Sequence, residues 1–224
     1  HLDFPGISGP WAGLATLVSV PLALTLGVTA AIRRNSLLDR TISLATLSMV
    51  AVPEFLVATL GVLLFAVKLG WLPSIAVVPE HATPWSFLRG YILPVTSLSF
   101  VVVAQMARMT RSAVIDQLRQ PYAEMALLKG LSPTRIALVH ALPNAAGPIV
   151  NAVALSLSYL LGGAIIVETI FNYPGVASLM VDAVTSRDMP LLQTCAMIFC
   201  AGYLLLVLVA DVCAILANPR LRHA

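Results

Sequence analysis

The sequence predicts an all-α fold, a bundle of helices that crosses a membrane several times. Hydrophobic residues make up 59% of the chain and charged residues only 10%, whereas soluble domains carry charges at about a quarter of their positions. The mean hydropathy is +0.93, and the apolar residues gather in runs long enough to cross a hydrocarbon core, which takes about 20 residues of helix. Because these runs are apolar on every face and must satisfy their own backbone hydrogen bonds, they are expected to be helices.

Five such runs fit one membrane domain that covers residues 1–224. The predicted spans are 11–32, 41–67, 91–115, 141–167 and 189–216. Of the 13 Lys and Arg residues, ten fall on one side of the predicted membrane: Arg33, Arg34, Arg40, Arg108, Arg111, Arg119, Lys129, Arg135, Arg220 and Arg222. Only Lys68, Arg89 and Arg187 fall on the other side. Since basic residues concentrate in cytoplasmic loops, the C-terminus and the loop 119–141 are predicted to be cytoplasmic.

The start of the chain bears on the number of spans. Five spans with a cytoplasmic end imply an external beginning, and residues 1–10 (HLDFPGISGP) show neither an initiating Met nor a signal sequence. We therefore expect an N-terminally truncated chain, with five visible spans of six.

The loop 119–141 is punctuated like two short helices joined at a corner. Pro121 suits the first position of a helix, and Gly130 suits the left-handed residue that follows a helix end. Ser132 and Pro133 then provide an N-cap and a first-turn proline for a second helix, which Pro143 interrupts before the fourth span. Taken singly, these residues need be no more than caps. The loop as a whole is longer than the 2 to 8 residues of an ordinary helix connection. This extra length favours a docking element for a cytoplasmic partner.

The same residues resemble a known motif. Glu124, Ala126, Gly130 and the pair Leu142-Pro143 are similar in spacing to the "EAA" loop of ATP-binding-cassette (ABC) importer permeases. Met125 and His140 depart from the general pattern, but "LKGLS" (128–132) and "HALPNA" (140–145) resemble the dipeptide, oligopeptide and nickel branch. The resemblance extends over nearly the whole chain, including "GGAIIVETIFNYPGVASLMVDAV" (162–184), and "GWLP" (70–73) is similar to the B-type subunit of that branch.

The resemblance implies a type I importer permease fold and a set of partners. These are a second homologous permease subunit, two ABC ATPase subunits, an extracytoplasmic substrate-binding protein and membrane lipid, with no nucleic acid. The implied location is the bacterial cytoplasmic (inner) membrane. The implied ATPase-coupling residues are Glu124, Met125, Ala126, Gly130, Leu131, Ser132 and Arg135. The chain has no glycine-rich phosphate-loop motif, so no catalytic residue or cofactor is expected in it, and ATP and Mg are expected in the ATPases.

Two further regions are candidate sites. Glu54 follows Pro53 inside the second span, where an isolated charge costs about 2.5 to 3.5 kcal/mol; it either lines the translocation path or is satisfied by backbone groups that Pro53 frees. The segment 168–190 is too short to span and has an amphipathic pattern. It is either a cover for the bundle or an external gate, and its candidate gate residues are Glu168, Phe171, Pro174 and Gly175.

These features together predict the permease subunit of an ATP-driven importer for short peptides, a transport subunit and not an enzyme. Nickel or another small solute is the alternative cargo. A secondary transporter or channel is the competing class, although it would require paired broken-helix sites at the membrane midplane and only Glu54 fits. No metal site is expected, because Cys195, Cys200 and Cys213 lack metal-ligand spacing and are predicted to be packed free thiols.

Overall fold

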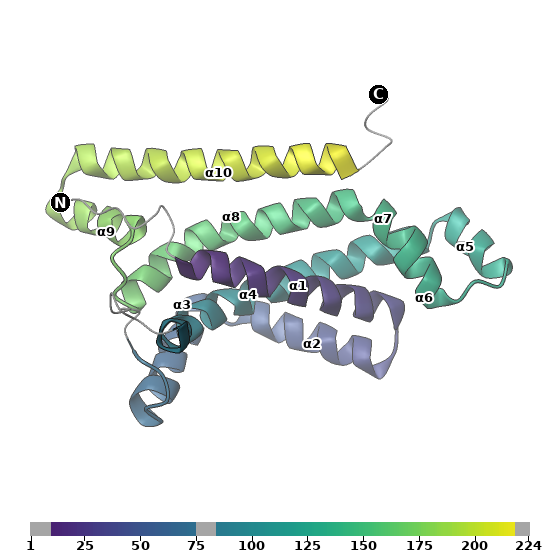
Figure 1. The fold of residues 1–224 in the computed structure, drawn as a ribbon, viewed down its shortest axis with the longest axis horizontal. Coiled ribbons are helices and arrows are strands. Elements are labelled where there is room, and N and C mark those ends of the chain that lie inside the picture. Colours follow the sequence, from purple (N-terminus) through teal and green to yellow (C-terminus); the bar gives the residue numbers. More distant parts are fainter. Residues whose placement is uncertain (1–9, 75–83, 218–224) are drawn as a thin grey trace. The chain divides into compact units, whose positions relative to one another are not determined.

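The computed structural model describes residues 10–74 and 84–217 and contains helices but no strand within those ranges (Figure 1). The predicted all-α fold is therefore confirmed. Arg220 and Arg222 lie outside the described residues. In chain order the helices are α1 (Pro10–Ile32), α2 (Leu37–Ala51), α3 (Glu54–Gly61), η1 (Val62–Lys68), α4 (Pro84–Leu118), α5 (Pro121–Leu128), α6 (Pro133–Arg135), η2 (Ile136–Ala141), α7 (Leu142–Asn144), α8 (Ala146–Ile170), α9 (Val176–Ser186) and α10 (Met189–Ala217). The two η elements are π-helices.

Four of the described helices contain stretches long and apolar enough to cross a membrane. These stretches are Gly13–Ile32, Leu88–Leu118, Ala146–Ile170 and Met189–Cys213. The pair formed by α2 and the continuous α3–η1 makes a fifth candidate if its two parts count as one span. The predicted runs 11–32, 91–115 and 189–216 thus each correspond to one helix.

The run 41–67 differs from the prediction, because it is not one helix. α2 ends at Ala51, and α3 begins at Glu54 after Pro53, whose φ of −59° and ψ of 137° are not helical. A proline cannot donate a backbone hydrogen bond, and it biases the preceding residue, here Val52, away from the helical region. The break is therefore a local consequence of Pro53.

The fourth predicted span, 141–167, is also divided near its start. Residues 141–144 belong to η2 and α7, and α8 begins only at Ala146, after a turn at Ala145. Pro143 sits two residues before this turn and removes a backbone donor from the helical ladder. The helix is therefore interrupted close to Pro143, as predicted.

The helices form two compact units. One contains His1–Val18, Ala51–Val102 and Ser158–Leu204, and the other contains Ser19–Val50, Val103–Leu157 and Leu205–Ala224. We call them unit 1 and unit 2.

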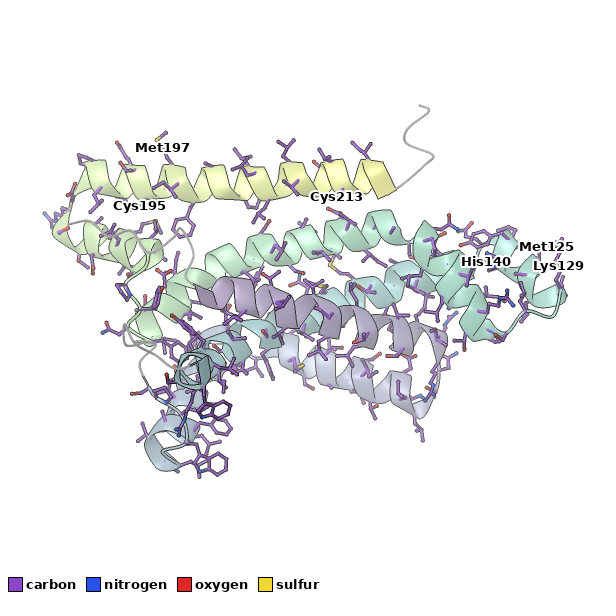
Figure 2. All side chains as sticks on the ribbon, viewed as in Figure 1. Met125, Lys129, His140, Cys195, Met197 and Cys213 are labelled. Atoms are coloured by element: carbon purple, nitrogen blue, oxygen red, sulfur yellow. The ribbon has the colours of Figure 1, made fainter. Side chains whose placement is uncertain are left out.

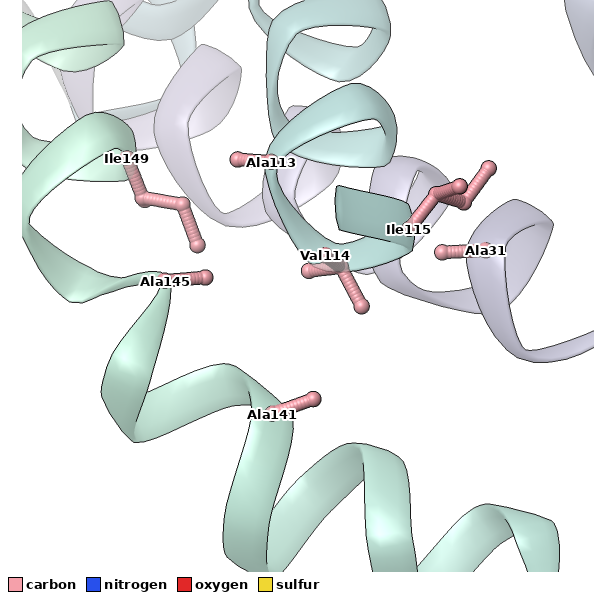
Figure 3. Close-up of a cluster of buried hydrophobic side chains, with 7 residues drawn as sticks. All are labelled: Ala31, Ala113, Val114, Ile115, Ala141, Ala145 and Ile149. Carbon is pink, nitrogen blue, oxygen red and sulfur yellow. The ribbon is translucent and has the colours of Figure 1, made fainter. Parts of the chain in front are cut away.

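Unit 2 is held by small side chains that let its helices approach closely. Figure 3 shows Ala141, Ala145 and Ile149 pointing toward Val114 of α4 in one buried cluster. At Gly27 of α1, an added Cβ would lie 2.7 Å from the backbone oxygen of Ala107, which is closer than a side chain allows. Close approach of small residues is a common way for membrane helices to pack.

Unit 1 has aromatic contacts near the start of α4 and the end of α8. The rings of Tyr91 and Tyr173 lie edge to face with centroids 6.5 Å apart, and Arg89 donates to the backbone oxygen of Trp71.

The cysteine prediction is only partly right. Cys195 is buried, but Cys200 and Cys213 are exposed on this chain, and all three are free.

Candidate functional site

The predicted coupling loop is a helical elbow, residues 119–141, built in unit 2. α5 starts with Pro121 at its first position after an extended Gln120. It ends in a Schellman motif, since Gly130 N donates to Leu127 O (2.9 Å) and Leu131 N donates to Ala126 O (3.2 Å). Gly130 has a φ of +81°, and a Cβ there would meet nothing within 4 Å. The left-handed conformation, and not a lack of space, thus favours glycine at this position.

The second arm of the elbow begins at Ser132, as predicted. Its hydroxyl accepts a hydrogen bond from Arg135 N (3.4 Å), and Pro133 occupies the first helical position. η2 and α7 then continue this arm to the turn before α8.

The elbow has a small hydrophobic interior of its own. Ala123 and Ala126 of α5 are buried against Ile136 of η2, with Tyr122 and Leu131 packed beside them. Alanines at these positions allow the two arms to lie close together, so the corner is held by packing as well as by caps. Ala126 therefore supports the elbow from inside, and a role in coupling would act through the shape of the elbow.

The outer face of the elbow is apolar and exposed. Met125 is 56% exposed and Leu128 is 82% exposed; three residues apart, they lie on one side of α5. Glu124, Lys129 and Arg135 are also exposed, and Figure 2 labels Met125 and Lys129 on this projecting arm. A pair of exposed apolar side chains with charged residues around it has the composition of a docking surface.

Glu54, in unit 1, is a buried carboxyl with no hydrogen bond of ordinary geometry to the described residues. It is 5% exposed, and neither carboxyl oxygen has a hydrogen bond of ordinary geometry, although Tyr159 lies close enough to interact with it. Gly163 of α8 makes room for it, since a Cβ there would lie 2.7 Å from Glu54 Oε1. The expectation that backbone groups freed by Pro53 satisfy Glu54 is therefore wrong, while Pro53 itself is exposed.

The predicted gate residues form a corner between α8 and α9 in unit 1. The Glu168 carboxylate is 1% exposed and accepts a hydrogen bond from Ser178 N (2.9 Å) at the first turn of α9. It thereby caps the helix in place of Gly175, which has no side chain to do so. A Cβ on Gly175 would lie 2.1 Å from the carboxyl carbon of Glu168, so this close approach requires glycine. Phe171 is 1% exposed, so the corner is well packed.

Two neighbours complete this corner. Pro174 is exposed and precedes the glycine, whereas Tyr173 is 8% exposed. Burial raises the pKa of the Tyr173 hydroxyl above its ordinary value.

One structural ion pair was not among the predicted residues. Arg111 of α4 makes two parallel hydrogen bonds to Asp39 of α2, Nε to Oδ1 at 2.6 Å and Nη2 to Oδ2 at 2.8 Å. Asn35 N also donates to Asp39 Oδ2 (2.9 Å), and Ser36 Oγ accepts from Asp39 N (3.2 Å). The spacing of Ser36 and Asp39 is a capping-box signal, so the start of α2 could have been read from the sequence, but its ionic partner could not.

Comparison with known proteins decides the family. The family of binding-protein-dependent transport system inner membrane components matches residues 23–223. The chain belongs to this family. The permease is 37% identical over 214 residues to the glutathione transport system permease protein GsiC of Escherichia coli (strain K12), covering 95% of this chain and 67% of GsiC. It is 36% identical over 214 residues to the probable peptide ABC transporter permease protein y4tP of Sinorhizobium fredii, covering 94% of this chain and 67% of that protein.

The family membership confirms the resemblance predicted from the elbow. The chain is a multi-pass inner-membrane permease component of a binding-protein-dependent transport system, and hence a transport subunit and not an enzyme.

Proposed function

We propose that this permease forms half of the translocation pathway of an ATP-driven importer for short peptides and couples that pathway to two cytoplasmic ATPases. The ATPases, with their ATP and Mg, a second homologous permease subunit and an extracytoplasmic substrate-binding protein complete the importer. The named functions of the relatives, glutathione and peptide transport, support a peptide cargo over nickel or another small solute. In this arrangement the C-terminus and the elbow are cytoplasmic, as the distribution of basic residues predicts.

The observation that carries this proposal is the construction of the elbow. Its inner face is closed by Ala123, Ala126 and Ile136, so the elbow keeps its shape without a partner. Its outer face presents Met125 and Leu128 to solvent, which is unfavourable unless a partner covers them. If the ATPases bind this outer face more tightly in one conformation of the permease than in another, their binding shifts the permease toward that conformation.

The buried polar groups of unit 1 suit roles in the pathway. Glu54 has no hydrogen bond within the described residues, so a cargo group or the second permease subunit is proposed to meet it during transport. The Glu168–Gly175 corner is proposed to move with α9 as an external gate, because the carboxylate cap ties the start of α9 to the end of α8.

The test replaces Glu124 with lysine and Gly130 with valine in the assembled complex. Glu124 is exposed in the first turn of α5, so Glu124→Lys should leave the fold intact and weaken ATPase copurification. Gly130→Val places a β-branched residue at a φ of +81° and should distort the corner, uncoupling ATP hydrolysis from uptake.

Matched controls separate docking from folding. Gly130→Asn should retain coupling, because asparagine tolerates the left-handed conformation, and Glu124→Asp keeps the charge. If the chain purifies without ATPases yet transports its cargo, the proposal fails and a secondary transporter or channel takes its place. Equal coupling in the Val and Asn variants would show that the shape of the elbow does not matter.

A further inference from the structure

Unit 2 contains a groove whose floor is a polar stripe on a membrane helix. The groove has a volume of about 850 Å³ and lies between α2, α4 and α8. Its floor is one face of α4, with Gln105, Arg108, Ser112 and Asp116 following each other at helical spacing. All four are exposed on this chain and lie in the second half of the candidate span Leu88–Leu118, toward the side that the basic residues predict to be cytoplasmic. Polar residues in such a span face water, a ligand or a partner and not lipid.

The two charged residues of the stripe, Arg108 and Asp116, have no ionic partner among the described residues. Arg111, which also reaches the groove, is paired with Asp39. In contrast, neither Arg108 nor Asp116 forms an ion pair within residues 10–74 and 84–217. Among the described residues, Arg108 and Asp116 are thus a cation and an anion of the groove without an ionic partner.

The spacing of these charges fits a ligand with charges at both ends. Arg108 and Asp116 lie eight residues apart on one helix, which is about 12 Å along its axis at 1.5 Å per residue. An extended chain of three amino acids spans about 10 Å, and the two side chains can reach toward its ends. Pairing would place a peptide carboxylate at Arg108 and a peptide ammonium group at Asp116.

The walls of the groove suit the rest of a short peptide. Asn151 of α8 and Ser112 of α4 are exposed to the groove and can hydrogen-bond to peptide groups. Leu47 and Val50 of α2 provide apolar surface for side chains. The volume is within the range of about 300 to 1,000 Å³ that is usual for small-molecule sites.

We infer that this groove is a cargo site inside the permease that recognises the two charged termini of a tripeptide, with Arg108 binding the carboxylate and Asp116 the ammonium group. The inference rests on the proposed importer function and deepens it. The permease would then contribute to selectivity after the binding protein has released the peptide.

The test measures uptake by the reconstituted complex with a zwitterionic tripeptide, its N-acetylated form and its C-amidated form. For each peptide, the rate of a variant is divided by the wild-type rate with the same binding protein, so that the selectivity of the binding protein cancels. Arg108→Gln should lower uptake of the free tripeptide about tenfold but leave the C-amidated form unchanged, since that peptide has no carboxylate to lose. Asp116→Asn should spare the N-acetylated form in the same way. Arg40→Gln, an exposed cation of α2 outside the groove, should change none of the three ratios.

The outcomes distinguish the site from the importer function. If the uptake rates of all three peptides fall equally in a variant, or none of them falls, the cargo site is overturned. ATP-dependent uptake by the wild-type complex would still support the proposed function in that case. Loss of the second permease subunit from Arg108→Gln complexes would show that the groove is a subunit contact, and would also overturn the site. If the wild-type complex takes up no peptide with ATP, the proposed function itself has failed. In all variants, ATP hydrolysis stimulated by the loaded binding protein should persist, because the elbow is untouched.

Discussion

The contact between Glu168 and Gly175 leads to a prediction that can be tested with a single methyl group. Gly175→Ala adds a Cβ that would lie 2.1 Å from the carboxyl carbon of Glu168. The backbone itself accepts alanine, since Gly175 has a φ of −115°. The strain is therefore steric, and the expected result is that the Glu168 carboxylate moves away and releases the first turn of α9.

The magnitude follows from the bond that is lost. Ser178 N donates to Glu168 Oε2 at 2.9 Å, and a hydrogen bond to a charged group contributes about 1.5 to 3 kcal/mol. Loss of an N-cap costs about 0.5 to 2 kcal/mol in measured cases. Taking about 2 kcal/mol for local opening of α9, amide hydrogen exchange in residues 175–180 should accelerate about 30-fold.

The assay is hydrogen exchange followed by mass spectrometry on the complex in nanodiscs. Glu168→Ala should accelerate exchange at α9 by the same factor, since it removes the same cap. The double variant should be no faster than either single variant, because the added methyl group then has no carboxyl to displace. Gly162→Ala in α8, where a Cβ meets nothing within 4 Å, is the matched control and should leave α9 unchanged. Unchanged exchange in Gly175→Ala, or multiplied effects in the double variant, would refute the reasoning.

Two further predictions concern unit 2. Asp39→Ala should lower the stability of the permease by about 2 to 4 kcal/mol, because it leaves Arg111 without its two hydrogen bonds in a partly buried site; thermal unfolding in detergent should show a lower Tm, and an unchanged Tm would mean that the pair contributes nothing. Gly27→Ala should destabilise by about 1 to 3 kcal/mol, since its Cβ would lie 2.7 Å from Ala107 O. Gly13→Ala in the same helix has open space around it and should be neutral in the same measurement, so equal effects at both glycines would contradict the steric explanation.

Local chemistry explains the parts that the sequence predicted well. The elbow needed only signals within a few residues of each other: Pro121 to start α5, Gly130 to end it in a left-handed conformation, and Ser132 to cap the next arm. Capping and backbone restrictions act over one turn, so they can be read directly from the order of residues.

Packing explains features that the sequence did not predict. Ala126 belongs to the motif on which the resemblance rests, yet its burial against Ile136 depends on how the two arms fold together. The partner of Asp39 is Arg111, 72 residues later, and no local signal links them. The break at Pro53, in contrast, is a local effect of the proline and could have been read from the sequence.

By itself, the sequence determined that this chain is a helical membrane protein, where most of its long apolar helices run, and that its polar loop is a capped elbow, because hydrophobic run length and capping are short-range properties. Only the tertiary structure decided which side of the elbow is buried, that Glu168 caps the helix that follows Gly175, and that the charges of α4 line a groove. These depend on contacts between helices that are distant in the chain, and such contacts are set by the shapes of the packed surfaces and not by the order of nearby residues.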